Sequence, residues 1–193
     1  MSEDKIYNEH FFKRTKRMEM PSAQAVAHIL IKHFHPKSII DIGCGVGIYL
    51  KEFENNNVDI IGFDSAAAAL NGSLVGNKIK LHDLCKPLTL NKSFDLCLCI
   101  EVAEHLKPEC GDILLETLTG LSQNIVFTAA TPGQGSEEIG HINEQSHEFW
   151  INAFEQMGFA LDKESTENIK KEMEDNSVVW WITKNLMIFK KLN

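Results

Sequence analysis

The chain has 193 residues, of which 44% are hydrophobic, and its formal net charge is −8 at pH 7. This length supports one substantial core, and no repeat or low-complexity run divides it, so we expect a single domain over residues 1–193. The negative charge argues against long nucleic acid as a partner, and no apolar run is long enough to span a bilayer. Together with the polar, acidic first residues MSEDK, this predicts a cytoplasmic protein without a membrane anchor.

The cysteines support the same location. They contain no CxxC pair and lie mostly in apolar surroundings, where a reduced, buried thiol is the default. We therefore expect five free thiols, at Cys44, Cys85, Cys97, Cys99 and Cys110.

In chain order, the first predicted element is a helix. Ser22 follows Pro21 and precedes an apolar pattern of helical spacing, which predicts that Ser22 is the N-cap of a helix ending before Pro36. Residues 1–36 thus form a helical cap. Within it, Tyr7, Phe11 and Phe12 either close over a ligand as a lid or pack the helix.

Strands and helices then alternate. The predicted strands are 38–42, 59–63, 79–82, 94–100 and 124–129, the helices are 49–53, 66–70, 108–121 and 148–157, and the last apolar runs, 178–182 and 186–189, complete the sheet. Such alternation predicts an α/β fold with one doubly wound, mostly parallel sheet and helices on both faces. Residues 37–130 would form the core that binds a cofactor, and residues 131–193 the acceptor-side loop and the C-terminal strands.

A glycine loop follows the first strand. Asp41, Gly43, Gly45 and Gly47 lie in the segment DIGCGVG, where glycines let the backbone turn sharply and approach a ligand. Such a loop alone is weak evidence, because the glycines can simply form a turn. Two further acids at strand ends add weight: Asp64 is placed to accept hydrogen bonds from ribose hydroxyls and Asp83 from an adenine amino group.

The segments IIDIGCGVG, IIGFDS, HDLCKPL and FDLCLCIEVAEHL resemble the successive motifs of Rossmann-like S-adenosylmethionine-dependent methyltransferases, over residues 39–106. The resemblance implies that Asp41, Gly43 and Gly45 hold the methionine part of the cofactor, Asp64 the ribose and Asp83 the adenine. The expected cofactor-binding residues are Asp41, Gly43, Cys44, Gly45, Asp64, Ser65, Asp83, Leu84, Ile100 and Glu101.

Candidate acceptor-site residues follow the fourth strand. Glu101, Glu104 and His105 are spaced i, i+3 and i+4, so they would share one side if the strand turned straight into a helix. His141 and His147 follow the loop TPGQG. Two carboxylates with one or two imidazoles can bind a divalent cation that orients a diol and acidifies one hydroxyl for methylation.

The ExxEH group with a later histidine is similar to the metal site of small-RNA terminal 2′-O-methyltransferases, and ExxEH also resembles that of ubiquinone-pathway O-methyltransferases. The resemblance implies Glu101, Glu104, His105 and His141 as metal ligands, with His147 as the alternative to His141. Mg²⁺, Mn²⁺, Fe²⁺, Co²⁺ and Zn²⁺ all remain open. The tail segments PGQG, GHINEQ, EFWINAFEQMGF and WWITKNLMIF resemble a bacterial group of small methyltransferases associated with sugar and glycan modification.

The leading expectation is therefore S-adenosylmethionine-dependent O-methylation of a sugar-like or other vicinal-diol small molecule by a monomer or homodimer, with Glu104, His105 and His141 as catalytic residues. A metal-free site with His105 or His141 as general base, and a merely structural role for Glu104 and His105, remain open. The competing functions are N- or C-methylation of another metabolite, methylation of an RNA end, and cofactor binding without catalysis. Methylation of an RNA end requires the basic cluster of residues 13–17 to lie beside the acceptor pocket.

Overall fold

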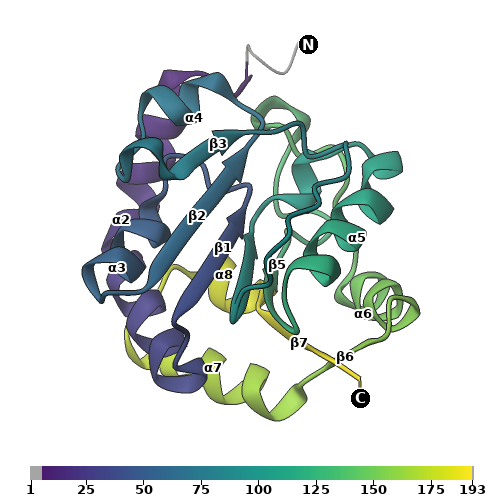
Figure 1. Cartoon of the computed structure of the whole chain (residues 1–193). Coiled ribbons are helices and arrows are strands. Elements are labelled where there is room, and N and C mark those ends of the chain that lie inside the picture. Colours follow the sequence, from purple (N-terminus) through teal and green to yellow (C-terminus); the bar gives the residue numbers. More distant parts are fainter. Residues whose placement is uncertain (1–5, 193) are drawn as a thin grey trace.

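The computed structural model describes residues 6–192, so residues 1–5 and 193 of the predicted domain lie outside the described residues. Within residues 6–192, seven strands form one sheet in the order β3-β2-β1-β4-β5-β7-β6 (Figure 1). The strands are β1 (Ser38–Ile42), β2 (Asp59–Asp64), β3 (Ile79–Leu81), β4 (Leu96–Ile100), β5 (Asn124–Thr128), β6 (Phe159–Leu161) and β7 (Met187–Lys191). The predicted doubly wound α/β fold is confirmed.

The first five strands pair in parallel, and β7 lies antiparallel between β5 and β6. β1 is the centre from which the chain moves outward in both directions, because it pairs with β2 on one side and β4 on the other. In an open parallel sheet the strand order reverses at such a point, and a crevice forms at the carboxyl ends of the two strands.

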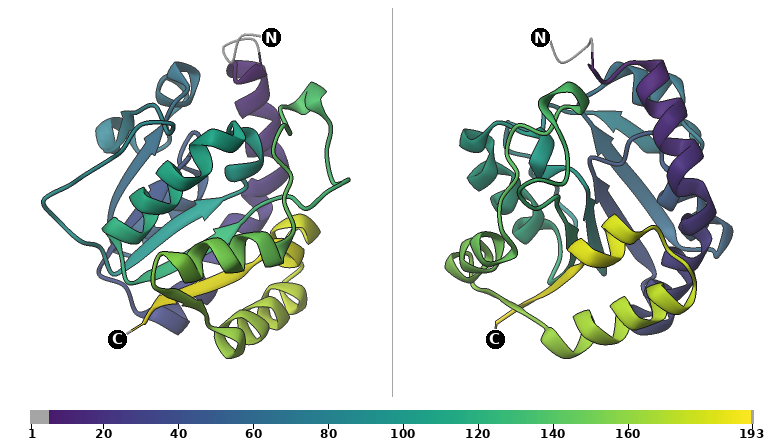
Figure 2. Two further views of the ribbon diagram at one scale, coloured as in Figure 1. Left: turned by 90° about the vertical axis from the view of Figure 1, so that its right-hand side faces the viewer. Right: turned by 180° about the vertical axis from the view of Figure 1, so that it is seen from behind.

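Helices cover both faces of the sheet (Figure 2). They are α2 (Glu9–Phe34), α3 (Ile48–Asn55), α4 (Ala67–Asn71), α5 (Gly111–Leu121), α6 (His147–Gln156), α7 (Lys163–Asp175) and α8 (Trp180–Asn185), with short 3₁₀ turns η1 (Gly76–Lys78), η2 (Ala103–His105), η3 (Pro108–Cys110) and η4 (Glu137–Ile139). Buried residues of α2, α3, α7 and α8 pack in one core cluster, and those of α5 and α6 in the other. No helix among residues 6–192 combines the length and the apolar character needed to cross a membrane.

The N-terminal helix begins earlier than predicted. α2 starts at Glu9, where the side chain of Asn8 caps the first turn, and it continues through Pro21. Ser22 is therefore not an N-cap but a buried residue whose Oγ accepts a hydrogen bond from the N–H of Val179, at 3.0 Å. The sequence pattern was misleading because proline and serine together are typical of a helix start. Here they lie inside α2, whose earlier turns line a cavity and therefore lack the apolar pattern of a helix packed on the core.

The C-terminal region also differs from the prediction. Residues 178–182 lead into α8 instead of forming a strand, and both α7 and β6 were missed. α7 is mostly polar and buries only Thr166, Ile169 and Met173, so its apolar stripe is too narrow to stand out in the sequence. β6 has three residues, too few for an alternating pattern to be recognised.

The expectation of five free thiols is wrong. Cys85 and Cys110 form a disulfide, while Cys44, Cys97 and Cys99 are buried free thiols. The bond joins the segment after β3 to η3, and this proximity arises only when both segments fold over the same end of the sheet. The cysteines therefore no longer support the predicted cytoplasmic location.

Candidate active site

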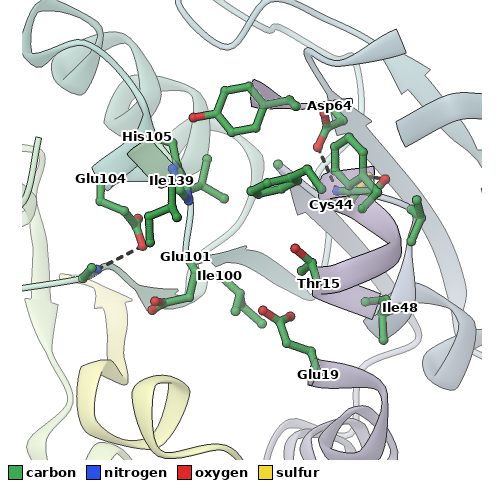
Figure 3. A pocket seen from close by; sticks show the side chains of 18 of the residues that line it. Thr15, Glu19, Cys44, Ile48, Asp64, Ile100, Glu101, Glu104, His105 and Ile139 are labelled. Carbon is green, nitrogen blue, oxygen red and sulfur yellow. Dashed lines mark hydrogen bonds between the residues drawn. The ribbon is translucent and has the colours of Figure 1, made fainter. Parts of the chain in front are cut away.

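A cavity of about 430 Å³ opens at the carboxyl ends of β1, β2 and β4 and is bordered by α2 on the opposite side (Figure 3). The fold brings all the residues predicted to bind cofactor or metal to its wall. These are Asp41, Gly43, Cys44, Gly45, Asp64, Ser65, Asp83, Leu84, Ile100, Glu101, Glu104, His105 and His141. Their common location follows from the parallel strands, which all deliver their carboxyl ends to one edge.

The glycine loop is packed tightly against the ends of neighbouring strands. Gly43 has a φ of +80°, donates its N–H to the carbonyl of Phe63 at 2.7 Å, and leaves no room for a side chain, because a Cβ would lie 2.4 Å from a methyl group of Val102. Gly45, with a φ of +53°, donates its N–H to the carboxylate of Asp64 at 2.8 Å. Position 43 therefore requires glycine, both because its φ is positive and because Val102 leaves no room for a Cβ atom.

The two acids at the strand ends differ in their surroundings. Asp64 is buried, and its two oxygens accept the N–H groups of Gly45 and Ala66, each at 2.8 Å; burial nevertheless raises its pKa. Asp83 is exposed, and hydrogen bonds from Lys86, at 3.0 Å, and from the N–H of Cys85, at 3.0 Å, lower its pKa. Asp64 thus fixes the glycine loop as well as facing the cavity, while Asp83 lies at the solvent edge.

The strand does not turn straight into a helix, so the condition under which Glu101, Glu104 and His105 would share one helix face is not met. Glu101 adopts a left-handed conformation, with a φ of +54°, and η2 is only a short 3₁₀ turn. The Oε1 atom of Glu101 therefore accepts a hydrogen bond from Asn185 at 3.2 Å. Glu104 is fully buried; its Oε1 accepts the N–H of Ala130 at 3.1 Å, and its Oε2 has no partner among the described residues. Burial, and secondly the nearby Glu101, raise the pKa of Glu104.

Two imidazoles complete this side of the cavity. The Nδ1 atom of His105 lies 3.2 Å from the carbonyl of Gly140, which can only accept, so Nδ1 carries the proton and Nε2 has a free lone pair. Burial, and secondly His141, lower the pKa of His105 to about 4, so this ring is neutral at pH 7. The ligand atoms offered by Glu104, His105 and His141 all lie within 4.8 Å of one another.

His141 is held by Glu144, a residue outside the predicted set. The Oε1 atom of Glu144 lies 2.7 Å from Nδ1 of His141, and its carboxylate accepts the N–H groups of Gly133 and Gly135, both at 2.6 Å. The spacing HxxE was the available sequence signal for this pair. His147, at the start of α6, lies outside the group formed by Glu104, His105 and His141.

The N-terminal aromatic residues both line the cavity and pack together. Tyr7, Phe11 and Phe12 all face it, and the ring of Tyr7 lies edge-on to that of His105 with 5.6 Å between centroids. Phe12 is buried in the core. These three side chains therefore both line the cavity and pack against one another, and their closure over a bound ligand stays a prediction.

The basic cluster of α2 is divided between two surfaces. Arg14 lines the cavity, whereas Lys13, Lys16 and Arg17 line a separate shallow groove on the helix. Most of this cluster is thus directed away from the candidate acceptor site. α2 also contributes Glu19 to the cavity, a residue that no sequence motif singled out.

Solved structures with the same fold include several methyltransferases. A methyltransferase from Archaeoglobus fulgidus described as S-adenosylmethionine-dependent is 18% identical, with a TM-score of 0.65, and the match covers 94% of this chain and 99% of that one. Magnesium protoporphyrin IX methyltransferase from Synechocystis, with bound S-adenosylhomocysteine, is 17% identical, with a TM-score of 0.60, and the match covers 75% of this chain and 74% of that one. At these identities the likeness establishes the fold.

A third structure is phosphoethanolamine N-methyltransferase 2 from Haemonchus contortus, bound to phosphomonomethylethanolamine and S-adenosylhomocysteine. It is 15% identical, with a TM-score of 0.62; the match covers 86% of this chain, which spans about half, 52%, of that chain. The last two proteins are named for chemically different acceptors, so the shared fold does not specify an acceptor. The comparison with curated protein sequences found no match.

The sequence itself matches a protein family described as "Methyltransferase domain" over residues 14–164, which is more than half of the chain. The matched region contains β1 to β5, the glycine loop and all the cavity residues discussed above except Tyr7, Phe11 and Phe12. The chain therefore belongs to this methyltransferase-domain family.

Proposed function

We propose that the protein transfers the methyl group of S-adenosylmethionine to one hydroxyl of a vicinal diol on a small, sugar-like molecule, with a divalent metal ion held by Glu104, His105 and His141. The observation that carries this proposal is the convergence of three ligand atoms within 4.8 Å on one wall of the cavity. The glycine loop, Asp64 and Asp83 would bind the cofactor beside them.

The donor set fits a metal ion. Among residues 6–192, Oε2 of Glu104 is buried without a hydrogen-bond donor, and such an orphaned oxygen is costly unless a ligand satisfies it. His105 and His141 each use Nδ1 for a protein acceptor, which leaves Nε2 for a ligand, and a carboxylate or carbonyl behind the ring is the usual support of a metal-binding histidine. One carboxylate and two imidazoles suit Mn²⁺, Fe²⁺, Co²⁺ or Zn²⁺ better than Mg²⁺.

Of the two roles expected for Glu101 from the sequence, lining the cofactor site and binding the metal, this proposal keeps only the first. The carboxylate of Glu101 is hydrogen-bonded to Asn185, and it is outside the group of three converging ligand residues. We therefore assign Glu101 to the wall between the cofactor and the acceptor, where its left-handed backbone turns the chain from β4 into η2.

Methyl transfer is an in-line displacement, so the acceptor oxygen must be aligned with the methyl group and must lose its proton. A divalent ion at Glu104, His105 and His141 would supply a binding point for both hydroxyls and lower the pKa of the one to be methylated. Glu144 holds His141 in place, and the edge of Tyr7 beside His105 helps to exclude water.

A second candidate mechanism uses no metal. His105 is neutral, with its free Nε2 in the cavity wall, so it can itself accept the hydroxyl proton as a general base. This mechanism requires the same acceptor orientation but predicts activity in the presence of a chelator.

The test is a methylation assay with chelator-treated protein, S-adenosylmethionine and a panel of catechols and sugars. Wild type, Glu104→Gln, His105→Ala and the control His28→Ala, an exposed residue of α2, are assayed with and without added Mn²⁺. The proposal predicts turnover that requires metal and is lost in both site variants but not in the control. Metal-independent turnover lost only in His105→Ala would support the general base, and cofactor binding without any turnover would support a non-catalytic protein.

A further inference from the structure

The cavity contains a second group of acids, apart from the imidazoles. Glu19 comes from α2, Asp41 from β1, and Glu101 from the end of β4. Figure 3 shows Glu19 and Thr15 projecting from α2 toward the end of β4, where Ile100 lies. Carboxylates from three separate elements thus face the same part of the cavity.

Glu19 is held in a defined position. Its Oε2 accepts a hydrogen bond from the hydroxyl of Tyr49 at 2.9 Å. Tyr49 belongs to the first turn of α3, which begins directly after the glycine loop, so the bond ties α2 to the loop that approaches the cofactor. The side chain of Glu19 is therefore part of the glycine-loop end of the cavity.

Among residues 6–192, Glu19 and Asp41 have no cationic partner, whereas Glu101 lies near His141. No ion pair of residues 6–192 includes Glu19 or Asp41, and the basic residues that line the cavity are Arg14, His105 and His141. Asp41 is only 2% exposed, and its Oδ2 has no hydrogen-bond partner. An uncompensated buried carboxylate is costly, which is why such groups are usually paired or bind a cation.

The pKa values of Glu19 and Asp41 reflect their burial beside other carboxylates. Burial raises the pKa of Glu19 to about 7, and burial followed by the charges of Asp64 and Glu19 raises that of Asp41 to about 8. A cation bound between them would stabilise both carboxylates. The site thus favours a positively charged ligand group.

S-adenosylmethionine carries an α-ammonium group on its methionine part. We propose that Glu19, positioned by Tyr49, binds this ammonium group together with Asp41, so that α2 forms one side of the methionine subsite. The inference rests on the proposed cofactor site, in which the glycine loop holds the methionine part. The ammonium group has three N–H donors. The Oδ2 atom of Asp41, which has no partner among residues 6–192, can accept one of them. The carboxylate of Glu19 can accept another, because the hydrogen bonds from Tyr49 and Trp181 use only two of its about four lone pairs.

The inference predicts that Glu19 distinguishes ligands with an amino-acid part from ligands without one. S-adenosylhomocysteine has the α-ammonium group, whereas 5′-methylthioadenosine shares the nucleoside but lacks it. Because hydrogen bonds to charged groups contribute about 1.5–3 kcal/mol, Glu19→Gln should weaken S-adenosylhomocysteine binding about 10- to 100-fold. Binding of 5′-methylthioadenosine should change by less than about twofold.

The experiment is calorimetric titration of both ligands into wild type, Glu19→Gln, Tyr49→Phe and the control Glu9→Gln, which alters an exposed acid of the same helix. Tyr49→Phe should weaken S-adenosylhomocysteine alone, by less than Glu19→Gln, and the control should match wild type. Unchanged S-adenosylhomocysteine affinity in Glu19→Gln would overturn the inference, as would an equal loss for both ligands in a variant whose thermal midpoint matches wild type. Failure of wild type to bind either ligand would overturn the cofactor site and this inference with it.

Discussion

Replacing Glu144 with Gln should weaken metal binding without removing any metal ligand. Burial opposes ionisation of Glu144, but hydrogen bonds from His141 and from the amides of Gly133 and Gly135 hold its pKa below the usual value, so it is charged at neutral pH. In Glu144→Gln, the new side chain would have one acceptor oxygen for the three donors, and its NH₂ group, which can only donate, would face at least one of their N–H groups, so that hydrogen bond would be lost. Loss of the partner behind a metal-binding histidine typically costs about 10- to 100-fold in affinity, or about 1.4–2.7 kcal/mol.

The assay is a Mn²⁺ titration of chelator-treated protein, followed by the electron paramagnetic resonance signal of the free ion. Glu138→Gln is the matched control, because Glu138 is an exposed acid of the same connecting segment. S-adenosylhomocysteine binding should be unchanged in both variants, which shows that the fold is intact. Wild-type Mn²⁺ affinity in Glu144→Gln would refute the argument that this carboxylate positions His141.

Two further substitutions test the loop and the fold. Gly43→Ala should reduce S-adenosylhomocysteine affinity at least about tenfold in calorimetry, because the left-handed backbone costs an alanine about 1–2 kcal/mol and its methyl group would collide with Val102. The control is Gly120→Ala, where the added methyl group meets open space, and this variant should bind S-adenosylhomocysteine like wild type. Asp162 is partly buried, yet Lys190 and local hydrogen bonds lower its pKa to about 2, below the value near 3.9 of an unfolded chain. Its charge therefore stabilises the fold above about pH 4, and this contribution is lost as the pH falls toward 2. Asp162→Asn should lower the free energy of unfolding by about 1 kcal/mol at pH 7, because Lys190 is half exposed and the ion pair is screened by solvent. A denaturant series should show the difference from wild type shrinking between about pH 5 and pH 2, and a difference that does not vary with pH would contradict the assignment.

The sheet and the cofactor end of the cavity were predictable from the sequence because their signals are local. The apolar runs that became β1 and β4 are each bounded by polar or glycine residues, and parallel strands bring their carboxyl ends together whatever the details of packing. Asp41, Asp64 and Asp83 lie at or just after the carboxyl ends of β1, β2 and β3, so their shared location could be inferred without coordinates.

The residues that the sequence did not reveal depend on long-range packing. Glu19 is one acid in a helix whose start was misplaced, and its place in the cavity depends on how α2 packs over the sheet and on the hydrogen bond from Tyr49. The left-handed backbone of Glu101 breaks the i, i+3, i+4 relation that a continuous helix would have produced. The disulfide between Cys85 and Cys110 joins two segments whose proximity cannot be predicted from the spacing of the cysteines in the sequence.

The most direct test of the proposed metal-assisted mechanism is a calorimetric titration of Mn²⁺ into chelator-treated wild type and His105→Ala, each saturated with S-adenosylhomocysteine. The geometry of Glu104, His105 and His141 predicts one ion per chain in wild type and a loss of at least about 100-fold in affinity in the variant. Wild type that binds S-adenosylhomocysteine but no metal ion would contradict the metal site and leave His105 as the base of a metal-free methyltransferase.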